Sequence, residues 1–215
     1  MIAPATGIAL AGVTGYLLGS IPFGYLVARA HGVDIFSVGS KNPGATNVRR
    51  TLGARAGNTV FVLDALKGVV SAGWPVLLVG AAQPGLAGLS LPKVMAMAGM
   101  VGSLLGHSYS CCTRFKGGKG VATGAGAFLV LSPLATLAAG LAWLATFLIG
   151  RYVSLASILA ALTLAAGVVL TRQPLPVEIA AGAVAVFVIV RHRTNIGRLL
   201  AGTENRSARK KGGAL

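Results

Sequence analysis

The chain has 215 residues, of which 54% are hydrophobic and only 11% are charged, and its mean hydropathy is +0.77. A water-soluble globule of this length cannot bury so much apolar sequence, so the composition predicts an integral membrane protein. The 19 Lys and Arg residues exceed the 4 Asp and Glu residues and give a net charge of +15. Because aromatic residues are only 6% and the basic residues lie between apolar segments, this charge indicates anionic lipids and anionic substrates as partners and no nucleic acid.

Apolar segments that approach the roughly 20 residues needed to cross a bilayer recur along the chain. They cover residues 4–28, 57–79, 94–112, 121–150, 153–171 and 176–191. The first has no Lys or Arg before it, so we expect a transmembrane span and not a cleavable signal peptide. The fourth is too long for one crossing, and Ser132-Pro133 near its middle predicts a break into two helices. The predicted fold is all-α, a polytopic membrane protein with seven transmembrane helices.

The basic residues predict the orientation of these helices. If the N-terminus lies outside and the C-terminus in the cytoplasm, every Lys and Arg residue except Lys93 and Arg172 falls on the cytoplasmic side, as the positive-inside rule requires. We expect a single seven-helix membrane domain over residues 1–205, followed by a basic cytoplasmic tail over residues 206–215 that frays and contacts lipid. Cys111 and Cys112 are adjacent, which favours reduced thiols and no disulfide framework.

The first predicted cytoplasmic loop, residues 34–50, is rich in Ser, Asn, Thr and Gly and ends in Arg49 and Arg50. Small hydrogen-bond donors followed by two guanidinium groups are typical of a phosphate cradle. The same composition also fits an ordinary turn-rich loop whose arginines only orient the protein. It is not a nucleotide-binding P-loop, because Ala45 stands where the lysine of that motif should be.

Asp64 and Lys67 lie three residues apart in the second span, so both side chains share one helical face at membrane depth. Ionisable groups inside a membrane are energetically expensive and are usually paired. The spacing therefore predicts a buried ion pair that holds this helix against its neighbours and has a secondary role at the functional site.

One side of the third span carries small residues, at Gly99, Gly102, Ser103 and Gly106. Such a stripe predicts close packing against another helix. His107 follows at the cytoplasmic end, where it could contact phosphate or steady the loop, and a lone histidine is more often structural. The H-x-x-x-x-D pairing used by some acyltransferases is absent, because Cys112 occupies the position of the acid.

Residues 115–120 read Phe-Lys-Gly-Gly-Lys-Gly, which we call the glycine-lysine run. Glycines let the backbone approach a ligand closely, and Lys116 and Lys119 supply point charges. The run is therefore suited to phosphate recognition at a bilayer surface.

His192 and Asn195 are spaced so that both face the same way on a helical extension of the last span. An imidazole and an amide at this place could orient a hydroxyl and polarise a carbonyl. The alternative is a basic cap at the membrane edge, which explains the neighbouring arginines but not Asn195.

Several enzyme signatures are absent, among them G-x-S-x-G and H-E-x-x-H. Asp34, Asp64, Glu178 and Glu204 are the whole acidic inventory, too few for a two-acid or two-metal mechanism. An enzyme of this composition would depend on positive charge and substrate positioning, and its substrates would have to be activated already.

Motifs along nearly the whole chain together resemble the bacterial acyl-phosphate:glycerol-3-phosphate acyltransferase family (PlsY type). They are Gly19–Gly24, Gly39–Arg50, Asp64-x-x-Lys67-Gly68, Gly106–Thr123, Arg151–Ser154 and His192-x-x-Asn195-Ile196. The resemblance implies an enzyme of the bacterial plasma (inner) membrane with seven spans and a cytoplasmic active site. It also implies transfer of a fatty acyl group from acyl phosphate to the sn-1 hydroxyl of glycerol 3-phosphate, giving lysophosphatidic acid and inorganic phosphate, with no metal or cofactor. The soluble enzyme that supplies acyl phosphate is a candidate partner.

The resemblance also implies roles for individual residues. His192, Asn195 and Lys119 are the expected catalytic residues. Further substrate-binding candidates are Ser40, Asn42, Asn47, Arg50, Lys67, His107, Lys116, Gly117 and Gly118, the two glycines through their main-chain amides. Lys41 and Pro43 depart from the family, which usually has glycine and a branched aliphatic residue there. The rival from another class is an anion transporter or channel, which would also carry basic loops and an intramembrane lysine.

Overall fold

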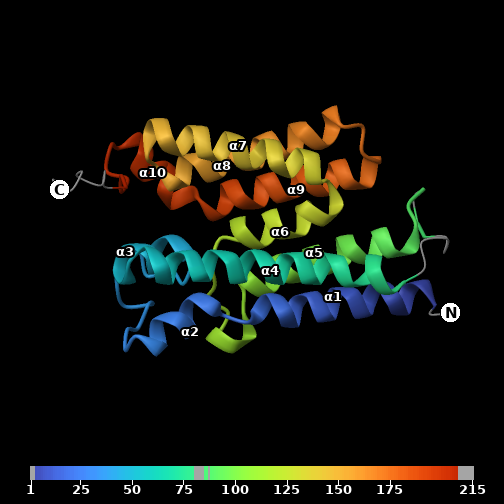
Figure 1. Ribbon diagram of the computed structural model, residues 1–215, viewed down its shortest axis with the longest axis horizontal. Coiled ribbons are helices and arrows are strands. Elements are labelled where there is room, and N and C mark those ends of the chain that lie inside the picture. Colours follow the sequence, from blue (N-terminus) through green and yellow to red (C-terminus); the bar gives the residue numbers. More distant parts are fainter. Residues whose placement is uncertain (1–2, 80–84, 87, 208–215) are drawn as a thin grey trace, which may run out of the picture.

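The computed structural model describes residues 3–79, 85–86 and 88–207, and the regular elements in that part of the chain are helices (Figure 1). In chain order they are α1 (Pro4–Ser20), α2 (Phe23–Ala30), α3 (Ala45–Leu52), α4 (Ala54–Leu78), α5 (Leu91–Ser108), the 3-10 helix η1 (Cys111–Thr113), α6 (Val121–Leu131), α7 (Pro133–Gly150), α8 (Val153–Leu170), α9 (Leu175–Arg191) and α10 (Arg193–Leu200). The prediction of an all-helical fold is confirmed for the described residues.

Each predicted apolar segment contains a helix, and the predicted break at Ser132-Pro133 is found. The backbone leaves the helical region at Ser132, and α7 begins at Pro133, where a missing N–H does no harm. The first segment also contains a break, which the sequence analysis did not predict. Helix α1 ends before Ile21-Pro22, and α2 starts at Phe23. The loop expected over residues 34–50 is only partly a loop, since its last residues form α3.

By length and composition, the described residues contain four helical segments able to cross a membrane, at Pro4–Ala30, Ala54–Leu78, Pro133–Gly150 and Val153–Leu170. A fifth is obtained if α9 and α10, which meet at 59°, form one bent span. The apolar helix α6 has only 11 residues and is too short to cross a bilayer without tilt or local thinning.

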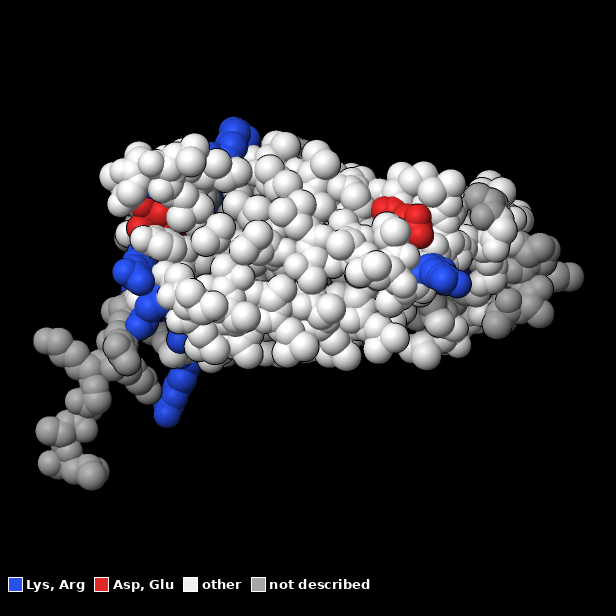
Figure 2. Space-filling model, turned by 90° about the horizontal axis from the view of Figure 1, so that it is seen from above, with Lys and Arg blue, Asp and Glu red and all other residues white. Residues whose placement is uncertain are grey.

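The surface separates into charged ends and an uncharged band. Figure 2 shows Lys, Arg, Asp and Glu at the two ends of the displayed face, with no charged residue between them. Leu134, Leu141 and Leu148, spaced seven residues apart on one face of α7, are each about two-thirds exposed. An apolar band between charged rims is the surface that a bilayer requires.

Glycines set the spacing of α1, α4, α5 and α6. A Cβ on Gly102 would collide with the backbone of Gly12 and Tyr16, and one on Gly106 would collide with Tyr16 and Ser20. The predicted role of the α5 stripe in close helix packing is therefore confirmed. Gly68 of α4 lies against α6 in the same way, with Thr123 in the place of its missing side chain. Small residues let helices approach each other where water cannot drive their association.

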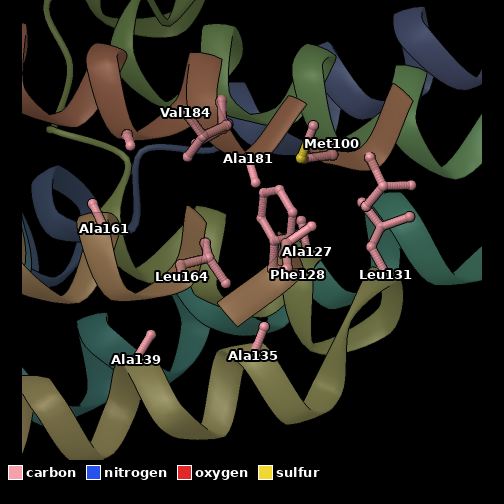
Figure 3. Close-up of a cluster of buried hydrophobic side chains, with 14 of the residues drawn as sticks. Met100, Ala127, Phe128, Leu131, Ala135, Ala139, Ala161, Leu164, Ala181 and Val184 are labelled. Carbon is pink, nitrogen blue, oxygen red and sulfur yellow. The ribbon is translucent and has the colours of Figure 1, made fainter. Parts of the chain in front are cut away.

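The short helix α6 lies between two groups of helices, α1, α4 and α5 on one side and α7, α8 and α9 on the other (Figure 1). Its Phe128 is fully buried and packs in one cluster with Met100 of α5, Leu164 of α8 and Ala181 of α9 (Figure 3). The residues just before α6 are consequently held between both groups.

Replacing Phe128 with Ala should destabilise the protein by about 3–5 kcal/mol, because the truncation leaves a cavity where both helix groups meet. Reversible unfolding in detergent measures the change. Leu134→Ala is the matched control, since Leu134 is 68% exposed on α7 and should change stability little. Equal destabilisation by the two substitutions would contradict a central role for α6.

Candidate functional site

A cavity of about 140 Å³ lies where the loop before α3, the glycine-lysine run and the junction of α9 and α10 meet. It is bordered by many of the residues that the sequence analysis selected: Ser40, Asn42, Asn47, Arg50, His107, Lys119, His192 and Asn195. These residues come from segments far apart in the sequence, so the helix packing itself assembles the cavity.

Lys119 stands at the centre of a chain of polar contacts. Its ammonium donates to Asn195 Oδ1, and Asn195 Nδ2 donates to Glu204 Oε1 at 2.6 Å. Glu204 also accepts hydrogen bonds from Ser154 Oγ at 2.8 Å and from Arg198 Nε at 2.7 Å. Asn195 and Glu204 are both buried, so the network fixes the position of the lysine.

Burial, hydrogen bonding and neighbouring charges shift the pKa values of two groups at the site. Burial lowers the pKa of Lys119 to about 8, with further lowering by Arg198, Arg191 and Arg50 and an opposing effect of Glu204. Burial alone would raise the pKa of Glu204, but its hydrogen bonds from Arg198, Asn195 and Ser154 outweigh that effect and lower it. Glu204 therefore stays ionised while Lys119 titrates close to neutral pH.

His192 is buried at the junction of α9 and α10, and its Nδ1 lies 2.8 Å from the carbonyl oxygen of Val188. Because a carbonyl only accepts hydrogen bonds, Nδ1 carries the proton in this contact. The neutral ring then presents Nε2 as an acceptor, which suits it to accept a hydrogen bond from a hydroxyl.

Asn47 shapes the loop before α3 and has no polar atom left over for a ligand in this arrangement. Its Oδ1 accepts the Ser40 N–H at 2.9 Å, and its Nδ2 donates to the Val38 carbonyl at 3.1 Å. Asn47 thus positions Ser40, which refines the predicted role of Asn47 in substrate binding.

Lys41 adopts φ +53°, a left-handed conformation that glycine accepts most readily. Lys41 is thus a non-glycine residue in a region of backbone conformation that L side chains rarely adopt.

Asn42 and Arg191 tie the glycine-lysine run to its surroundings. Asn42 Nδ2 donates to the Gly117 carbonyl at 3.2 Å, and Asn42 Oδ1 accepts the Gly44 N–H across Pro43 at 2.9 Å. Arg191 Nη2 donates to the Gly118 carbonyl at 2.7 Å. The sequence analysis did not select Arg191, whose contact lies 73 residues away along the chain.

Four predicted binding residues do not border this cavity: Lys67, Lys116, Gly117 and Gly118. Lys67 Nζ is engaged by Asp64 Oδ1 at 2.8 Å and by the Ile21 carbonyl at 3.0 Å. Lys116 is exposed on the loop.

The two glycines of the run serve close packing. The Gly118 N–H, which the sequence analysis expected to contribute to phosphate binding, donates to the His107 carbonyl at 3.0 Å. A Cβ on Gly117 would meet the backbone of His107 and Ser108, and a Cβ on Gly118 would meet the His107 imidazole.

One side of the cavity is apolar. It is formed by Phe61, Val121, Ala122, Trp143 and Val153, which come from α4, α6, α7 and α8. The Trp143 ring is held by a hydrogen bond from Nε1 to Ser157 Oγ at 3.3 Å and by stacking on Phe147. A polar and an apolar half in one cavity suit an amphiphilic ligand.

The segment after α10 closes back on the helices. The Asn205 carbonyl accepts a hydrogen bond from Arg50 Nη2 at 3.2 Å, and Arg206 Nε donates to the Gly150 carbonyl at 3.1 Å. The Ser207 N–H donates to the Arg151 carbonyl at 2.9 Å. The first residues of the predicted tail are therefore in contact with the helices, and its remainder, residues 208–215, lies outside the described residues.

Within the described part of the chain, no three His, Cys, Asp or Glu side chains gather in a way that could hold a metal ion. The cavity instead offers cations, amides, hydroxyls, the two imidazoles of His107 and His192 and the two carboxylates of Asp64 and Glu204.

The family model for glycerol-3-phosphate acyltransferase matches residues 9–202 of the chain. The chain belongs to the glycerol-3-phosphate acyltransferase family. A relative of that name from Geotalea daltonii is 45% identical over 193 residues, which cover 90% of this chain and 94% of the relative. A second relative of that name, from Aquifex aeolicus, is 43% identical over 194 residues. The match covers 90% of this chain and 96% of that relative.

Two solved structures share the fold. Both are crystal structures of PlsY (YgiH), described as an integral membrane glycerol 3-phosphate acyltransferase. The glycerol 3-phosphate form has a TM-score of 0.84 and 41% identity and covers 94% of this chain and 96% of that one. The lysophosphatidic acid form has a TM-score of 0.82 and 40% identity, with coverage of 94% and 95%. Together with the apolar helices, this likeness identifies a membrane-embedded acyltransferase of the PlsY type.

Glu204 is the residue at the site that the sequence analysis did not select, although it is one of only four acidic residues and lies in a basic segment. Glu204→Ala should destabilise the protein by about 1–3 kcal/mol, because the buried Asn195 amide loses its acceptor. Thermal unfolding in detergent measures this loss. Glu178→Ala, in the first turn of α9, is the control, and a loss no larger than the control's would argue against the network.

Proposed function

We propose that this protein transfers a fatty acyl group from acyl phosphate to the sn-1 hydroxyl of glycerol 3-phosphate, forming lysophosphatidic acid and inorganic phosphate in the first step of phospholipid synthesis. The observation that carries this proposal is the convergence of Lys119, His192 and Asn195 on one half-polar, half-apolar cavity. The similar fold of PlsY, which has been solved in glycerol 3-phosphate and lysophosphatidic acid forms, supports the same proposal.

The polar half supplies groups for two phosphates. Lys119 and Arg50 border the cavity as cations, and Ser40 borders it beside the loop that Asn47 holds. Guanidinium and ammonium groups form short, charge-assisted hydrogen bonds with phosphate oxygens. We assign phosphate binding to these three residues.

His192 and Asn195 act at the reacting atoms in this proposal. His192 Nε2 accepts a hydrogen bond from the attacking hydroxyl. Asn195 donates one N–H to Glu204, and the second N–H of the same amide is assigned to the carbonyl oxygen of the donor.

The reaction balances without a cofactor. The hydroxyl oxygen of glycerol 3-phosphate forms a new bond to the acyl carbon, and the bond from that carbon to the phosphate oxygen of the donor breaks. The hydroxyl proton passes to the departing phosphate. Acyl phosphate is a mixed anhydride and is already activated, so an enzyme nucleophile is not needed.

The apolar half of the cavity is assigned to the acyl chain. Phe61 of α4 is about half exposed, and Trp143 faces the same cavity from α7. A chain that enters from lipid between these helices would bring its phosphate end to Lys119.

We further propose that the chain forms a single domain over residues 1–205, crosses the bacterial plasma (inner) membrane seven times and has its active site on the cytoplasmic side. The start of α1 and the helix α10 lie at opposite ends of the long axis (Figure 1), as an odd number of crossings requires. The end that holds the cavity also holds Arg50, Lys119 and Arg198, in agreement with the positive-inside rule. The proposed partners are anionic membrane lipids and the soluble enzyme that supplies acyl phosphate.

The deciding assay adds long-chain acyl phosphate and glycerol 3-phosphate to the protein purified in detergent. We expect phosphate release that depends on both substrates. Lys119→Ala should lower kcat/KM about 100- to 1000-fold, and His192→Ala about 100-fold or more. Arg193→Ala, an exposed neighbour of His192, is the control. Absence of phosphate release, with uptake of anions into liposomes that contain the protein, would favour a transporter.

The pH dependence tests the charge of Lys119. With a pKa of about 8, the ammonium is charged below that pH and loses its charge as the pH rises through it. We therefore expect kcat/KM to fall on the alkaline side with a midpoint near pH 8. Lys119→Arg stays charged over this range, so its residual activity should lack that fall. An unchanged alkaline limb in Lys119→Arg would assign the titration to another group.

A further inference from the structure

A cluster of three ionisable side chains lies beside the glycine-lysine run, where α4 packs on α5. Asp64 Oδ1 is 2.8 Å from Lys67 Nζ and 3.5 Å from His107 Nδ1. All three side chains are at most 9% exposed. The i,i+3 pair was expected from the sequence, whereas the contact with His107 joins two different helices.

Two members of the cluster, Lys67 and His107, also contact further segments. Lys67 Nζ donates to the Ile21 carbonyl at 3.0 Å, at the break between α1 and α2, and lies over the Phe23 ring. The carbonyl of His107 accepts the Gly118 N–H at 3.0 Å. The His107 imidazole occupies the space that a side chain on Gly118 would need.

These contacts leave Lys67 unsuited to substrate binding. Its ammonium is engaged by a carboxylate and a carbonyl, and the pair with Asp64 neutralises its charge. The space that Lys67 borders, together with Asp64, His107, Gly117 and Gly118, has a volume of about 10 Å³, which is room for about one water molecule. A phosphate does not fit there.

The connection to Lys119 runs through the backbone. Gly117 and Gly118 are fixed by His107 on one side and by Asn42 and Arg191 on the other. Lys119 follows Gly118 directly, and Gly120, in a left-handed conformation, is the N-cap residue just before α6. The position of the Lys119 ammonium therefore depends on where these two glycines are held.

We infer that Asp64, Lys67 and His107 form a positioning cluster that fixes the backbone of Gly117 and Gly118 and so sets the Lys119 ammonium against Asn195. The inference deepens the proposed function, on which its kinetic test rests. Asp64 orients the imidazole, and Lys67 neutralises Asp64 and anchors it to the break between α1 and α2. The imidazole packs against Gly118, while the His107 carbonyl accepts its N–H. None of the three needs to touch substrate.

Loss of the cluster should change the surroundings of Lys119. Charged and titratable groups face this lysine from several elements: Arg50 of α3, Arg191 of α9, His192 at the junction, Arg198 of α10 and Glu204 after α10. Burial among these groups lowers its pKa to about 8. If the glycine-lysine run were released from His107, the Lys119 ammonium could reach water. The pKa of Lys119 would then rise toward the ordinary lysine value of about 10.4.

Two variants separate the cluster from general folding effects. His107→Ala removes the imidazole alone. Asp64→Asn combined with Lys67→Gln removes both charges together, because Asp64→Asn alone would leave a buried lysine without its counterion and could unfold the protein. Ser71→Ala is the control, since Ser71 is a buried polar residue of α4 whose hydroxyl donates to the Lys67 carbonyl at 2.7 Å.

The first measurement does not depend on catalysis. Labelling of folded protein with acetic anhydride at a series of pH values, read by mass spectrometry at Lys119, gives the pKa of its amine. We expect the midpoint to rise by about one unit or more in both variants and to stay near 8 in wild type and Ser71→Ala. An unchanged midpoint in the folded variants would overturn the inference.

The second measurement follows phosphate release from acyl phosphate and glycerol 3-phosphate. The KM for glycerol 3-phosphate should rise about 10- to 100-fold in both variants, as expected when a binding group is displaced by about 1 Å. The alkaline limb of kcat/KM should move upward with the labelling midpoint. A raised KM with an unmoved midpoint would show direct contact with substrate and reject a positioning role. Absence of release by wild type would reject the proposed function, while the labelling result would still decide the inference.

Discussion

A buried carboxylate, Glu204, allows the positive groups of the site to lie close together. It accepts hydrogen bonds from Ser154 of α8, from Asn195 and from Arg198 of α10, and its charge acts on Lys119 and Arg50. Without that charge the surrounding cations would repel one another in a poorly hydrated space. The residues after Glu204 then bind Arg50 of α3, Gly150 at the end of α7 and Arg151 just before α8, so that one short segment connects α3 with the junction of α7 and α8.

The second constraint is space. In a membrane the helices gain stability from close packing, and the glycines of α1, α4, α5 and α6 allow their backbones to touch. The same device continues into the glycine-lysine run, where Gly117 and Gly118 pack on His107 and Ser108. Because α6 is buried between the two helix groups, both groups hold the glycine-lysine run before it in a fixed position. The position of Lys119 is thus determined by helix packing and not by its own flexible side chain alone.

Local sequence patterns predicted what depends on nearby residues. Apolar length predicted the helices, Ser132-Pro133 predicted the break before α7, and the spacing of Asp64 and Lys67 predicted their ion pair, all of which the structure contains. The missed features depend on how separate helices meet. Three contacts were missed: that of His107 with Asp64, that of Glu204 with Asn195, and the hydrogen bond from the Gly118 N–H to His107. Predicting them requires knowing how distant segments align in space, and no local sequence pattern contains that information. Composition alone indicated that the main-chain amides of the glycine-lysine run were free to bind a ligand.

The acid and base inventory of the cavity limits how a proton can leave the attacking hydroxyl. Asp64 and Glu204 are the carboxylates that border the cavity among the described residues. Asp64 is paired with Lys67 and Glu204 with Arg198, and each is held by further hydrogen bonds or by His107. A carboxylate stabilised as an anion in this way is a weak base. His192 has an open Nε2, but its burial and then the positive charge of nearby Lys119 lower the pKa of the ring and so oppose a second proton on it. The phosphate that leaves the acyl carbon is itself a base, lies beside Lys119 in the proposed complex and gains a proton as its bond breaks. The arrangement of charge therefore favours a reaction in which the substrate supplies the base and the protein supplies position and positive potential.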